Sequence, residues 1–412
     1  MSANQEPPAQ GTTTPPAALN LNTVLQRMLA VSDKVSDLIF SPGRPPQVEL
    51  LGNLQGVHIP GLEKLTPAHT AGIAKVIISS HLQAGQDVAV ARNLEQSGST
   101  DVSYSAPGLA RFRVNIFMQR GTHAIVMRVI PHRPPQFEEL NLPEQLKTIV
   151  ELKNGIVLVT GPTGSGKSST LAAIIGLINE TKSYHIVTIE DPIEFLHTHD
   201  KSTIHQRELH SDTPDFALAL RAALRQAPKV ILVGEMRDRE TMEVALEAAE
   251  TGHLVLSTLH TIDAAKTVER IIGVFPKDEE QSIRTRLAQS FRYIVSQRLL
   301  RRADGSGRVA AIEILKATSR TKEYIERGES DGKSLMDAME QGEVEGMQTF
   351  DGQLEKMVRE GLVTKEDALA YASNQGNLLL RLGAFGAGGP PPPPPPPKVE
   401  PKPNSMLDMI ER

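Results

Sequence analysis

The chain has 412 residues, of which 39% are hydrophobic and 23% charged, and a net charge of −5 at pH 7. This length exceeds one ordinary hydrophobic core, so two or three domains are expected. The absence of cysteine excludes disulfides and cysteine-ligated zinc, and the charge balance gives no indication of nucleic-acid binding. No apolar run reaches a membrane-spanning length and the N-terminus lacks a secretory-signal pattern, so we expect a soluble, cytoplasmic protein.

The first third of the chain predicts a short disordered segment followed by a small mixed domain. Residues 1–20 are rich in Pro, Thr, Gln and Ala and show no periodicity, as is typical of disorder. In residues 21–133, helical spacing occurs together with the apolar–polar alternation of antiparallel strands, which predicts an α+β domain. Helices are expected at 21–29 and 67–82, and strands at 37–40, 48–51, 101–104, 110–116 and 124–130. Prolines then mark a linker over residues 134–140.

The second part of the chain predicts an α/β domain over residues 141–382. Up to about residue 315, apolar strands alternate with amphipathic helices, and this order predicts a parallel sheet flanked by helices. The strands are expected at 156–160, 185–190, 229–233 and 253–258, and short helices at 320–382. Residues 383–412 predict a Gly/Pro-rich tail, flexible and then stiff as polyproline II. The tail either presents the apolar patch at 405–412 to a partner or is an inert extension.

A glycine-rich loop follows the first of these strands. Gly161 to Ser168 reads Gly-Pro-Thr-Gly-Ser-Gly-Lys-Ser, which fits G-x-x-x-x-G-K-[ST] in the strand–loop–helix context that a phosphate-binding loop requires. Backbone N–H groups and the positive end of the helix surround phosphate oxygens in such a loop. Lys167 is expected to reach the β- and γ-phosphates of ATP, and Ser168 to hold Mg²⁺. The candidate nucleotide-binding residues are Gly161, Pro162, Thr163, Gly164, Ser165, Gly166, Lys167, Ser168 and Ser169.

Two further strands lead into carboxylates at the same edge of the expected sheet. One ends in Glu190 and Asp191, with Glu194 close behind, where a carboxylate can polarise an attacking water. A solvated acidic turn is the alternative interpretation. The next strand leads into Glu235 in the form of a Walker B element, with Gly234 in the place of the usual Asp. Glu235 is then the candidate for contacting Mg²⁺ through water, unless it is only a surface residue.

A histidine and several arginines complete the candidate site. His260 ends a buried strand at the site edge, where it either donates to the γ-phosphate or has a structural role. Arg113 and Arg128 lie on expected strands of the first domain, where each either pairs with a carboxylate or acts as an arginine finger on the next subunit's phosphates. Arg221 and Arg225 are weaker candidates of the same kind. The other histidines of this region lack metal-ligand spacing and predict a solvated hairpin; they are His185, His197, His199, His205 and His210.

Four sequence boxes together resemble the secretion ATPase superfamily, and within it the type IV pilus retraction ATPases. They are Gly161–Ser168, Thr188–Glu194, Leu232–Asp238 and Ala249–Thr261. The similarity extends from about residue 21 to 380. Further matching stretches lie at 110–115, 206–208, 296–300, 307–310 and 345–349. An ordered set of this kind is highly specific.

The resemblance implies a homohexameric ring of subunits, each with an N-terminal PAS-like domain and a C-terminal RecA-like ATPase domain. ATP would bind between the two domains, at subunit boundaries. The resemblance further implies Glu190 as general base, Glu235 as a Mg²⁺ contact, His260 as a γ-phosphate sensor, and Arg113 and Arg128 as arginine fingers. Such a motor would act on the inner-membrane platform protein from the cytoplasmic face and drive pilus retraction and twitching motility, with no nucleic-acid partner.

Three departures from the family pattern keep other functions open. Val35-Ser-Asp-Leu-Ile39 lacks the family's His, Arg225-Gln-Ala-Pro-Lys229 lacks three acidic side chains, and residues 319–328 only faintly match the retraction signature. One alternative is a pilus assembly or type II secretion ATPase, although these commonly carry a four-cysteine zinc insert and a longer N-terminal domain. Another is a nucleotide-binding regulator of a partner motor. A DNA translocase is more distant, because no basic stripe is visible.

Overall fold

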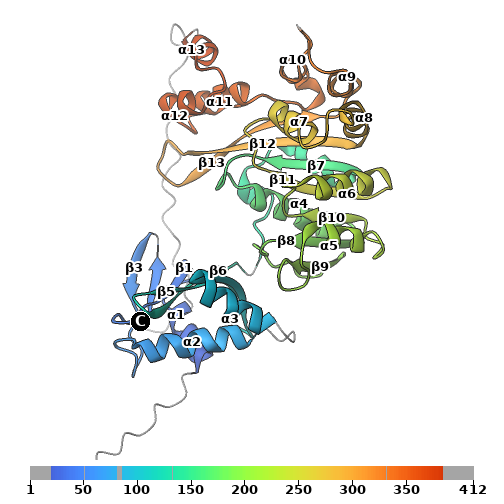
Figure 1. Cartoon of the computed structure of the whole chain (residues 1–412). Coiled ribbons are helices and arrows are strands. Elements are labelled where there is room, and N and C mark those ends of the chain that lie inside the picture. The colour runs from blue at the N-terminus through green and yellow to red at the C-terminus, as the bar shows by residue number, and fades with distance from the viewer. Residues whose placement is uncertain (1–19, 51, 81–85, 132, 331, 384–412) are drawn as a thin grey trace, which may run out of the picture.

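The computed structural model describes residues 20–50, 52–80, 86–131, 133–330 and 332–383. Two β-sheets organise the chain, one in each part of it (Figure 1). Among the described residues, no helix is long and apolar enough to cross a bilayer. Most of the expected N-terminal disordered segment and nearly all of the expected Gly/Pro-rich tail lie outside this range.

The first sheet has six antiparallel strands in the order β3-β2-β1-β6-β5-β4. Its strands are β1 (Val35–Phe40), β2 (Gln47–Leu50), β3 (Asn53–Gly56), β4 (Ser99–Ala106), β5 (Ala110–Gln119) and β6 (Thr122–Ile130). Its helices are α1 (Leu21–Leu29), α2 (Pro67–Ser79) and α3 (Gln86–Ser97). The helix expected at 21–29 is present with the same ends, and the other expected helix and strands are present with shifted ends, whereas β3 and α3 were not predicted. Strand β3 is exposed at all four positions, so it lacks the alternation that would have indicated a strand.

Alternation along β5 separates the two faces of this sheet. Phe112, Val114 and Ile116 are fully buried in the core that the sheet shares with α1 and α2. Successive side chains of a strand point to opposite faces, so Arg111 and Arg113 lie together on the other face. A hydrogen bond from Arg111 to Glu208 shows that this second face is turned toward the other sheet.

The second sheet has seven strands in the order β13-β12-β7-β11-β10-β8-β9. They are β7 (Gly155–Thr160), β8 (His185–Glu190), β9 (Thr203–Glu208), β10 (Val230–Val233), β11 (Leu254–Leu259), β12 (Phe291–Arg301) and β13 (Arg308–Lys316). The four expected strands are present to within one residue at each end. The expectation of a wholly parallel sheet is wrong at one edge, because β13 pairs antiparallel with β12. The other neighbours pair in parallel, so the fold is α/β with a mixed sheet.

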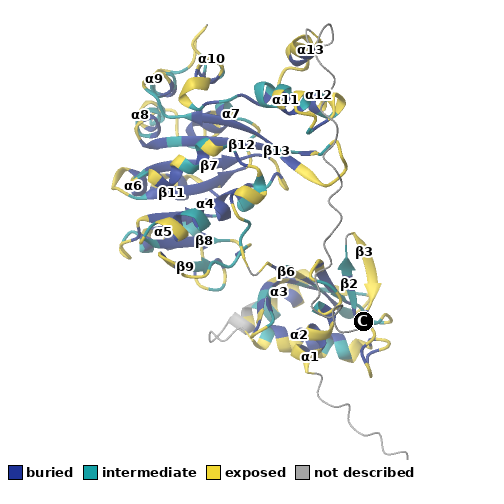
Figure 2. Cartoon of the chain, turned by 180° about the vertical axis from the view of Figure 1, so that it is seen from behind, coloured by how far each residue is buried: buried dark blue, intermediate teal, exposed yellow. Residues whose placement is uncertain are grey.

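Helices cover both faces of the second sheet, and its central strands are buried throughout (Figure 2). In β7, Ile156 and Leu158 belong to one core with α6 and α8, whereas Val157 and Val159 belong to the opposite core with α4. Burial on both faces accounts for the continuous apolar runs from which these strands were predicted. The covering helices include α4 (Lys167–Thr181), α5 (Phe216–Ala223), α6 (Arg239–Glu250), α7 (Ala264–Ile272) and α8 (Glu280–Ser290).

The C-terminal part is helical, as expected for residues 320–382. Helices α11 to α13 pack on β12 and β13 through a separate core that includes Leu300, Val309, Phe350 and Leu354. The five helices are α9 (Ser319–Arg327), α10 (Leu335–Gln341), α11 (Phe350–Arg359), α12 (Lys365–Tyr371) and α13 (Gln375–Gly383).

Candidate functional site

The glycine loop joins β7 to α4 at the carboxyl edge of the second sheet. Gly161 has a φ of +143°, and a Cβ at this position would lie 2.4 Å from the carbonyl oxygen of Gln297, so no larger residue fits without displacing the backbone. Gly166 has a φ of +90° and directly precedes Lys167, where α4 begins. The unpaired N–H groups of the first helical turn therefore adjoin the loop, which is the arrangement that binds phosphate.

The side chain of Lys167 is held over the loop by backbone carbonyl groups at the start of the loop. Its Nζ donates hydrogen bonds of 3.0 Å to the carbonyl oxygens of Gly161 and Pro162. Burial lowers the pKa of Lys167, whereas the carboxylates of Glu194 and Glu235 act in the opposite direction. A desolvated amine within reach of the loop can exchange these carbonyls for the oxygens of a polyphosphate.

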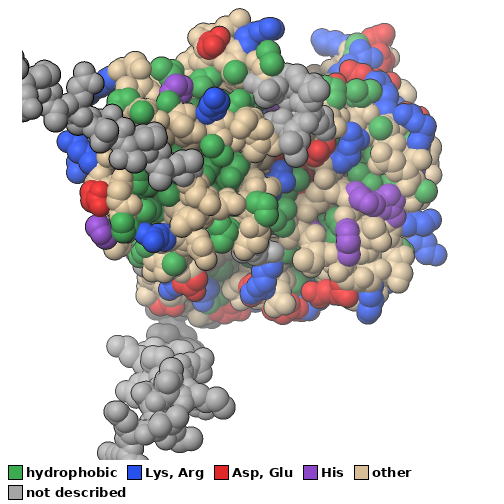
Figure 3. Space-filling model, turned by 90° about the horizontal axis from the view of Figure 1, so that it is seen from below, with side chains coloured by type: hydrophobic (Ala, Val, Ile, Leu, Met, Phe, Trp, Pro, Cys, Tyr) green, Lys and Arg blue, Asp and Glu red, His purple; other side chains and the backbone are tan. Residues whose placement is uncertain are grey.

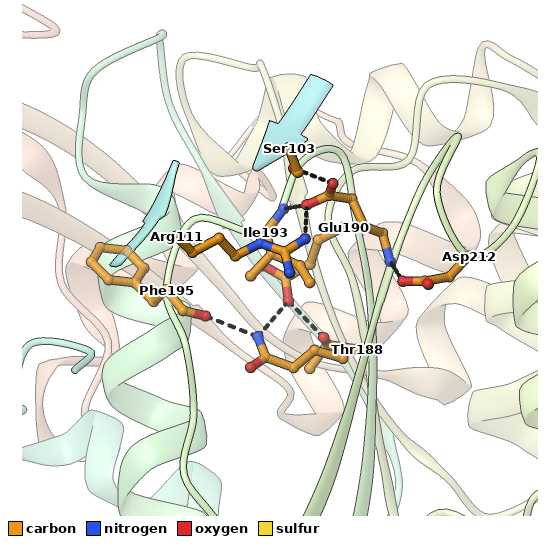
Figure 4. A network of polar contacts seen from close by, with 9 residues as sticks. Ser103, Arg111, Thr188, Glu190, Ile193, Phe195 and Asp212 are labelled. Atoms are coloured by element: carbon orange, nitrogen blue, oxygen red, sulfur yellow. Dashed lines mark hydrogen bonds and ion pairs between the residues drawn. The ribbon is translucent and has the colours of Figure 1, made fainter. Parts of the chain in front are cut away.

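Glu190 stands at the carboxyl end of β8, where the sequence predicted a base. Its Oε1 accepts a 2.6 Å hydrogen bond from Thr188 Oγ1 and a 3.2 Å bond from Gln206 Nε2 (Figure 4). Burial raises the pKa of Glu190, and the two hydrogen bonds act against that rise. A carboxylate with a raised pKa is a stronger base, and its two donors fix its direction.

Glu235 and His260 are in contact at the ends of β10 and β11. Glu235 forms an ion pair with Arg237, and its Oε2 lies 3.6 Å from His260 Nε2. Burial and the nearby Lys167 lower the pKa of His260, whereas Glu235 acts in the opposite direction, so a neutral imidazole is favoured at neutral pH. Gly234 stands where most Walker B elements have Asp, and a Cβ there would lie 3.3 Å from the Ile189 carbonyl oxygen. The missing Asp side chain is therefore matched by a close approach of the backbone to β8.

One cavity of about 650 Å³ collects most of these residues. Its lining includes Arg113, Thr163, Gly164, Gly166, Lys167, Ser168, Ser169, Glu190, Asp191, Glu194, Glu235 and His260. Pro162 and Ser165 instead border an adjacent cavity with Arg298 and Tyr371. The predicted loop, carboxylates, histidine and one predicted arginine therefore converge in a space large enough for a nucleotide.

The predicted arginines differ in their surroundings. Arg113 is exposed on β5 and lines the cavity of its own chain's glycine loop. Arg128 lies opposite Arg113 on β6 but forms a 3.0 Å ion pair with Asp37. The approach of Arg113 needs no second subunit, and contact with the next subunit's phosphates stays a prediction.

The two weaker arginine candidates do not border the nucleotide cavity among the described residues. Arg221 forms a 2.5 Å ion pair with Glu240 on α6. Arg225 donates a 3.2 Å hydrogen bond to the carbonyl oxygen of Arg221. Neither contact indicates a role at phosphate: the first joins α5 to α6, and the second is local to the C-terminal end of α5.

The expectation of a solvated histidine hairpin is wrong. Strands β8 and β9 are parallel neighbours, and residues 191–202 connect them as a crossing loop. His197 lies in that loop at the nucleotide cavity, and burial lowers its pKa to about 4. His185 is the first residue of β8, and His205 lies within β9. Nε2 of His185 is 2.9 Å from Nδ1 of His205. Within the described residues, no group of three or more His, Cys, Asp or Glu side chains is placed to hold a metal.

The polar side chains of β9 were not predicted as part of the site. Gln206 contacts the candidate base and also donates a 2.9 Å hydrogen bond to the carbonyl oxygen of Phe195. Glu208 accepts hydrogen bonds from Arg111 and Ser103 of the first sheet (Figure 4). The strand reads Thr-Ile-His-Gln-Arg-Glu, which has too little apolar character to indicate a strand. The only available signal was the position of 206–208 among the stretches that resemble the ATPase family.

Comparison with known proteins agrees with this geometry. The family model of the type II/IV secretion system protein matches residues 62–370. The type IV pilus retraction ATPase PilT of Pseudomonas aeruginosa is 43% identical over 84% of this chain and 96% of its own length. A twitching motility protein of Neisseria gonorrhoeae is 45% identical over 80% of this chain and 84% of its own length.

A solved structure of the pilus retraction motor PilT with bound ADP has the same fold. It is 40% identical to this chain, covers 87% of it and 98% of its own chain, and superposes with a TM-score of 0.76. The resemblance inferred from the four sequence boxes is confirmed. With more than half of its length matched by the family model, the chain belongs to the type II/IV secretion system protein family.

Proposed function

We propose that the chain is an ATP-hydrolysing motor that drives retraction of a type IV pilus. One observation carries the proposal: the glycine loop, Glu190, Glu235, His260 and Arg113 border one cavity. The names of the two near-full-length relatives, a pilus retraction ATPase and a twitching motility protein, support the pilus as the substrate of the motor. The ADP in the related structure supports a nucleotide as the ligand of the cavity.

Each residue of the cavity is assigned a separate role in phosphoryl transfer. The loop backbone and Lys167 bind the phosphates, and Glu190 accepts a proton from the attacking water. His260 donates to the γ-phosphate, and Arg113 offsets the negative charge that builds on it in the transition state. Arg128, which is held by Asp37, is assigned the same role only after that ion pair opens. Because catalysis of this kind consists of positioning and charge stabilisation, no covalent intermediate is required.

The donor set of the cavity fits Mg²⁺. Mg²⁺ takes oxygen ligands and is commonly held by one or two protein groups together with substrate phosphates. The hydroxyl of Ser168 and the carboxylate of Glu235 both line the cavity and would hold the ion. Bound there, Mg²⁺ would neutralise charge on the β- and γ-phosphates. The protein's own part is to keep Ser168 at the start of α4 and Glu235 beyond β10.

The quaternary and domain assignments belong to the same proposal. Residues 21–133 are assigned as a PAS-like domain and residues 141–382 as a RecA-like ATPase domain, joined by the linker 134–140. Six subunits would form a ring that acts from the cytoplasm on an inner-membrane platform protein at the pilus base. Domain closure on ATP would supply the movement, since ATP binds the closed arrangement better than the open one. Basic and acidic side chains are interspersed on the face seen in Figure 3, in keeping with a protein rather than a nucleic-acid partner.

Two other functions remain as outcomes of the test. An assembly or secretion ATPase would share the cavity, but the absence of cysteine favours retraction. A regulator that binds ATP without turnover would share the fold and the loop. It gains support only from the sequence departures at 225–229 and 319–328.

The deciding experiment measures Mg²⁺-dependent ATP hydrolysis by the purified chain together with its mass in solution. Turnover by a hexamer that stops on chelation and returns with Mg²⁺ is the expected result. Complementation of a retraction-deficient strain then separates retraction from assembly, because only a retraction motor restores twitching. A hexamer that binds ATP and does not hydrolyse it would replace the motor with the regulator.

A further inference from the structure

Glu208 is a buried carboxylate at the contact between the two sheets. It is 3% exposed and ends β9, the edge strand of the second sheet. Its Oε2 accepts 3.0 Å hydrogen bonds from Arg111 Nη2 and from the backbone N–H of Ile193, and its Oε1 accepts one from Ser103 Oγ. Two of these donors belong to the first sheet and one to the loop that follows Glu190. The Glu208 carboxylate therefore joins the N-terminal part to the loop that follows Glu190 (Figure 4).

Arg111 and Arg113 are linked by the geometry of β5. Residues two apart on a strand share a face and are separated by roughly 7 Å along it. Arg111 is bound to Glu208, whereas Arg113 borders the nucleotide cavity. Strand β5 is rigidly paired on both sides, with Ser103 opposite Arg113 on β4 and Arg128 opposite it on β6. When Glu208 holds Arg111, it therefore also sets the position of Arg113 relative to the nucleotide cavity.

The other side of the contact leads to the base. In the parallel pairing of β8 with β9, Glu190 is the register partner of Glu208, and Thr188 is that of Gln206. Gln206 donates to Glu190 Oε1, while its own Oε1 accepts a 2.9 Å hydrogen bond from the His197 backbone. The Glu208 backbone is anchored in turn by a 2.8 Å hydrogen bond to Asp212 Oδ2. One short strand thus holds the base through Gln206 and the arginine-bearing sheet through Glu208.

We propose that Arg111 and Glu208 are positioning residues that hold the N-terminal sheet against β9, so that Arg113 faces the same nucleotide that Glu190 serves. The inference rests on the proposed ATPase function for its catalytic consequence. Neither residue touches the nucleotide: each acts through the placement of another. When this ion pair opens, Arg113 is free to leave the cavity. The arrangement with the pair formed is therefore ready for hydrolysis, and the arrangement with the pair broken is open.

The first test replaces each partner in turn and measures steady-state ATP hydrolysis. Glu208→Gln keeps the size of its side chain, and Arg111→Gln replaces the guanidinium by a shorter neutral amide, so each variant removes the ion pair. The exchange Arg111→Glu with Glu208→Arg restores opposite charges. The matched control is Arg286→Gln, since Arg286 is 28% exposed and binds Glu250 at 2.8 Å within the second part, against 21% for Arg111. We expect kcat to fall by about tenfold to a hundredfold in both single variants, as follows from a misplaced catalytic group.

The split between kcat and KM separates positioning from a structural defect. Because the glycine loop is untouched, KM for ATP should stay within about twofold of the wild-type value. The charge exchange should recover part of the lost kcat, and Arg286→Gln should keep the wild-type kcat. Loss of kcat in the control as well, or a rise in KM with unchanged kcat, would overturn the assignment.

The second test measures the arrangement of the two parts directly. The natural chain has no cysteine, so spin labels can be placed at Lys75→Cys on α2 and Ser282→Cys on α8, both exposed positions. Labelled subunits are diluted into unlabelled ones, and the distance distribution is recorded without nucleotide. We expect a narrow distribution in the parent and in Arg286→Gln, and a broad one in Glu208→Gln and Arg111→Gln. Identical distributions in all four proteins would refute the contact.

The two tests also distinguish the inference from the function on which it rests. If the parent protein hydrolyses no ATP, the proposed function fails, and the distance measurement still decides whether Arg111 and Glu208 hold the two parts together. If the parent hydrolyses ATP and the variants keep both its kcat and its distances, the positioning role fails while the function stands.

Discussion

Substitution of Glu190 by glutamine tests the assignment of the general base most directly. The change keeps the shape of the side chain and removes only its capacity to accept a proton. The oxygen of the new amide can still accept the hydrogen bonds that Thr188 Oγ1 and Gln206 Nε2 now donate to Glu190 Oε1. The orientation of the side chain should therefore survive, so a loss of rate reports on chemistry rather than on disorder.

The structure gives the size and sign of the expected effects. Removal of a positioned general base typically costs about 10²–10⁴-fold in rate, and the kcat of Glu190→Gln should fall within that range. The stability of Glu190→Gln, in contrast to its kcat, should not fall. Burial raises the pKa of Glu190, so its favourable contribution to folding is present below the ordinary carboxyl pKa and is lost as pH rises through the raised value. At pH 8 the neutral amide should leave the melting temperature equal or higher.

The assay combines steady-state hydrolysis, a titration with ADP and thermal unfolding at pH 8. Nucleotide affinity should stay near the wild-type value because the glycine loop is unchanged. The control is Asp200→Asn, which removes an exposed carboxylate from the same connecting loop. Wild-type kcat in Glu190→Gln would remove this residue from the role of base. Loss of ADP binding or a lowered melting temperature would show that the side chain mainly holds the structure.

Three further changes have expected outcomes of different kinds. Lys167→Ala removes the buried amine from the glycine loop and should abolish hydrolysis and weaken ADP binding by at least about tenfold, measured by calorimetry. Arg113→Ala should lower kcat by about 10²-fold or more with little change in KM; in rings mixed with wild-type subunits, inhibition beyond the mutant fraction would show action in trans. Glu313→Gln should raise the melting temperature more at pH 8 than at pH 5.5, because burial raises the pKa of Glu313 to about 7 and its contribution to folding is lost as pH rises from 4.5 through that value. Equal shifts at both pH values would contradict the last prediction.

The sequence was sufficient where one kind of pattern determined the structure. The central strands are buried on both faces, so their largely apolar sequences located β7, β8, β10 and β11 to within one residue. The glycine loop was recognisable because its conformation admits few residues, as the 2.4 Å approach at Gly161 illustrates. The carboxylates after β8 and β10 followed from topology alone, since parallel strands end at one edge of the sheet.

The sequence was insufficient where long-range contacts replaced local pattern. Strand β9 is polar because its side chains bind the base, the connecting loop and the first sheet, and those partners lie far away in the chain. The edge pair β12 and β13 likewise contains Arg, Gln and Glu among its apolar positions, and no local signal shows that β13 returns antiparallel. The burial of His197 depends on the path of the 191–202 loop, which the expectation of a hairpin had misplaced.

The relation between the two predicted arginine fingers depends on the pairing register of β5 and β6, which the sequence does not reveal. Arg113 and Arg128 are directly opposite on β5 and β6, and like charges in that position repel each other. Asp37 on β1 lies opposite Arg128 and forms a 3.0 Å ion pair with it, so one of the two positive charges is compensated. Arg113 has no ion-pair partner among the described residues, which leaves its charge directed at the cavity. A phosphate would supply the missing negative charge, so we expect the catalytic role to fall first on Arg113, whereas the charge of Arg128 is already compensated by Asp37.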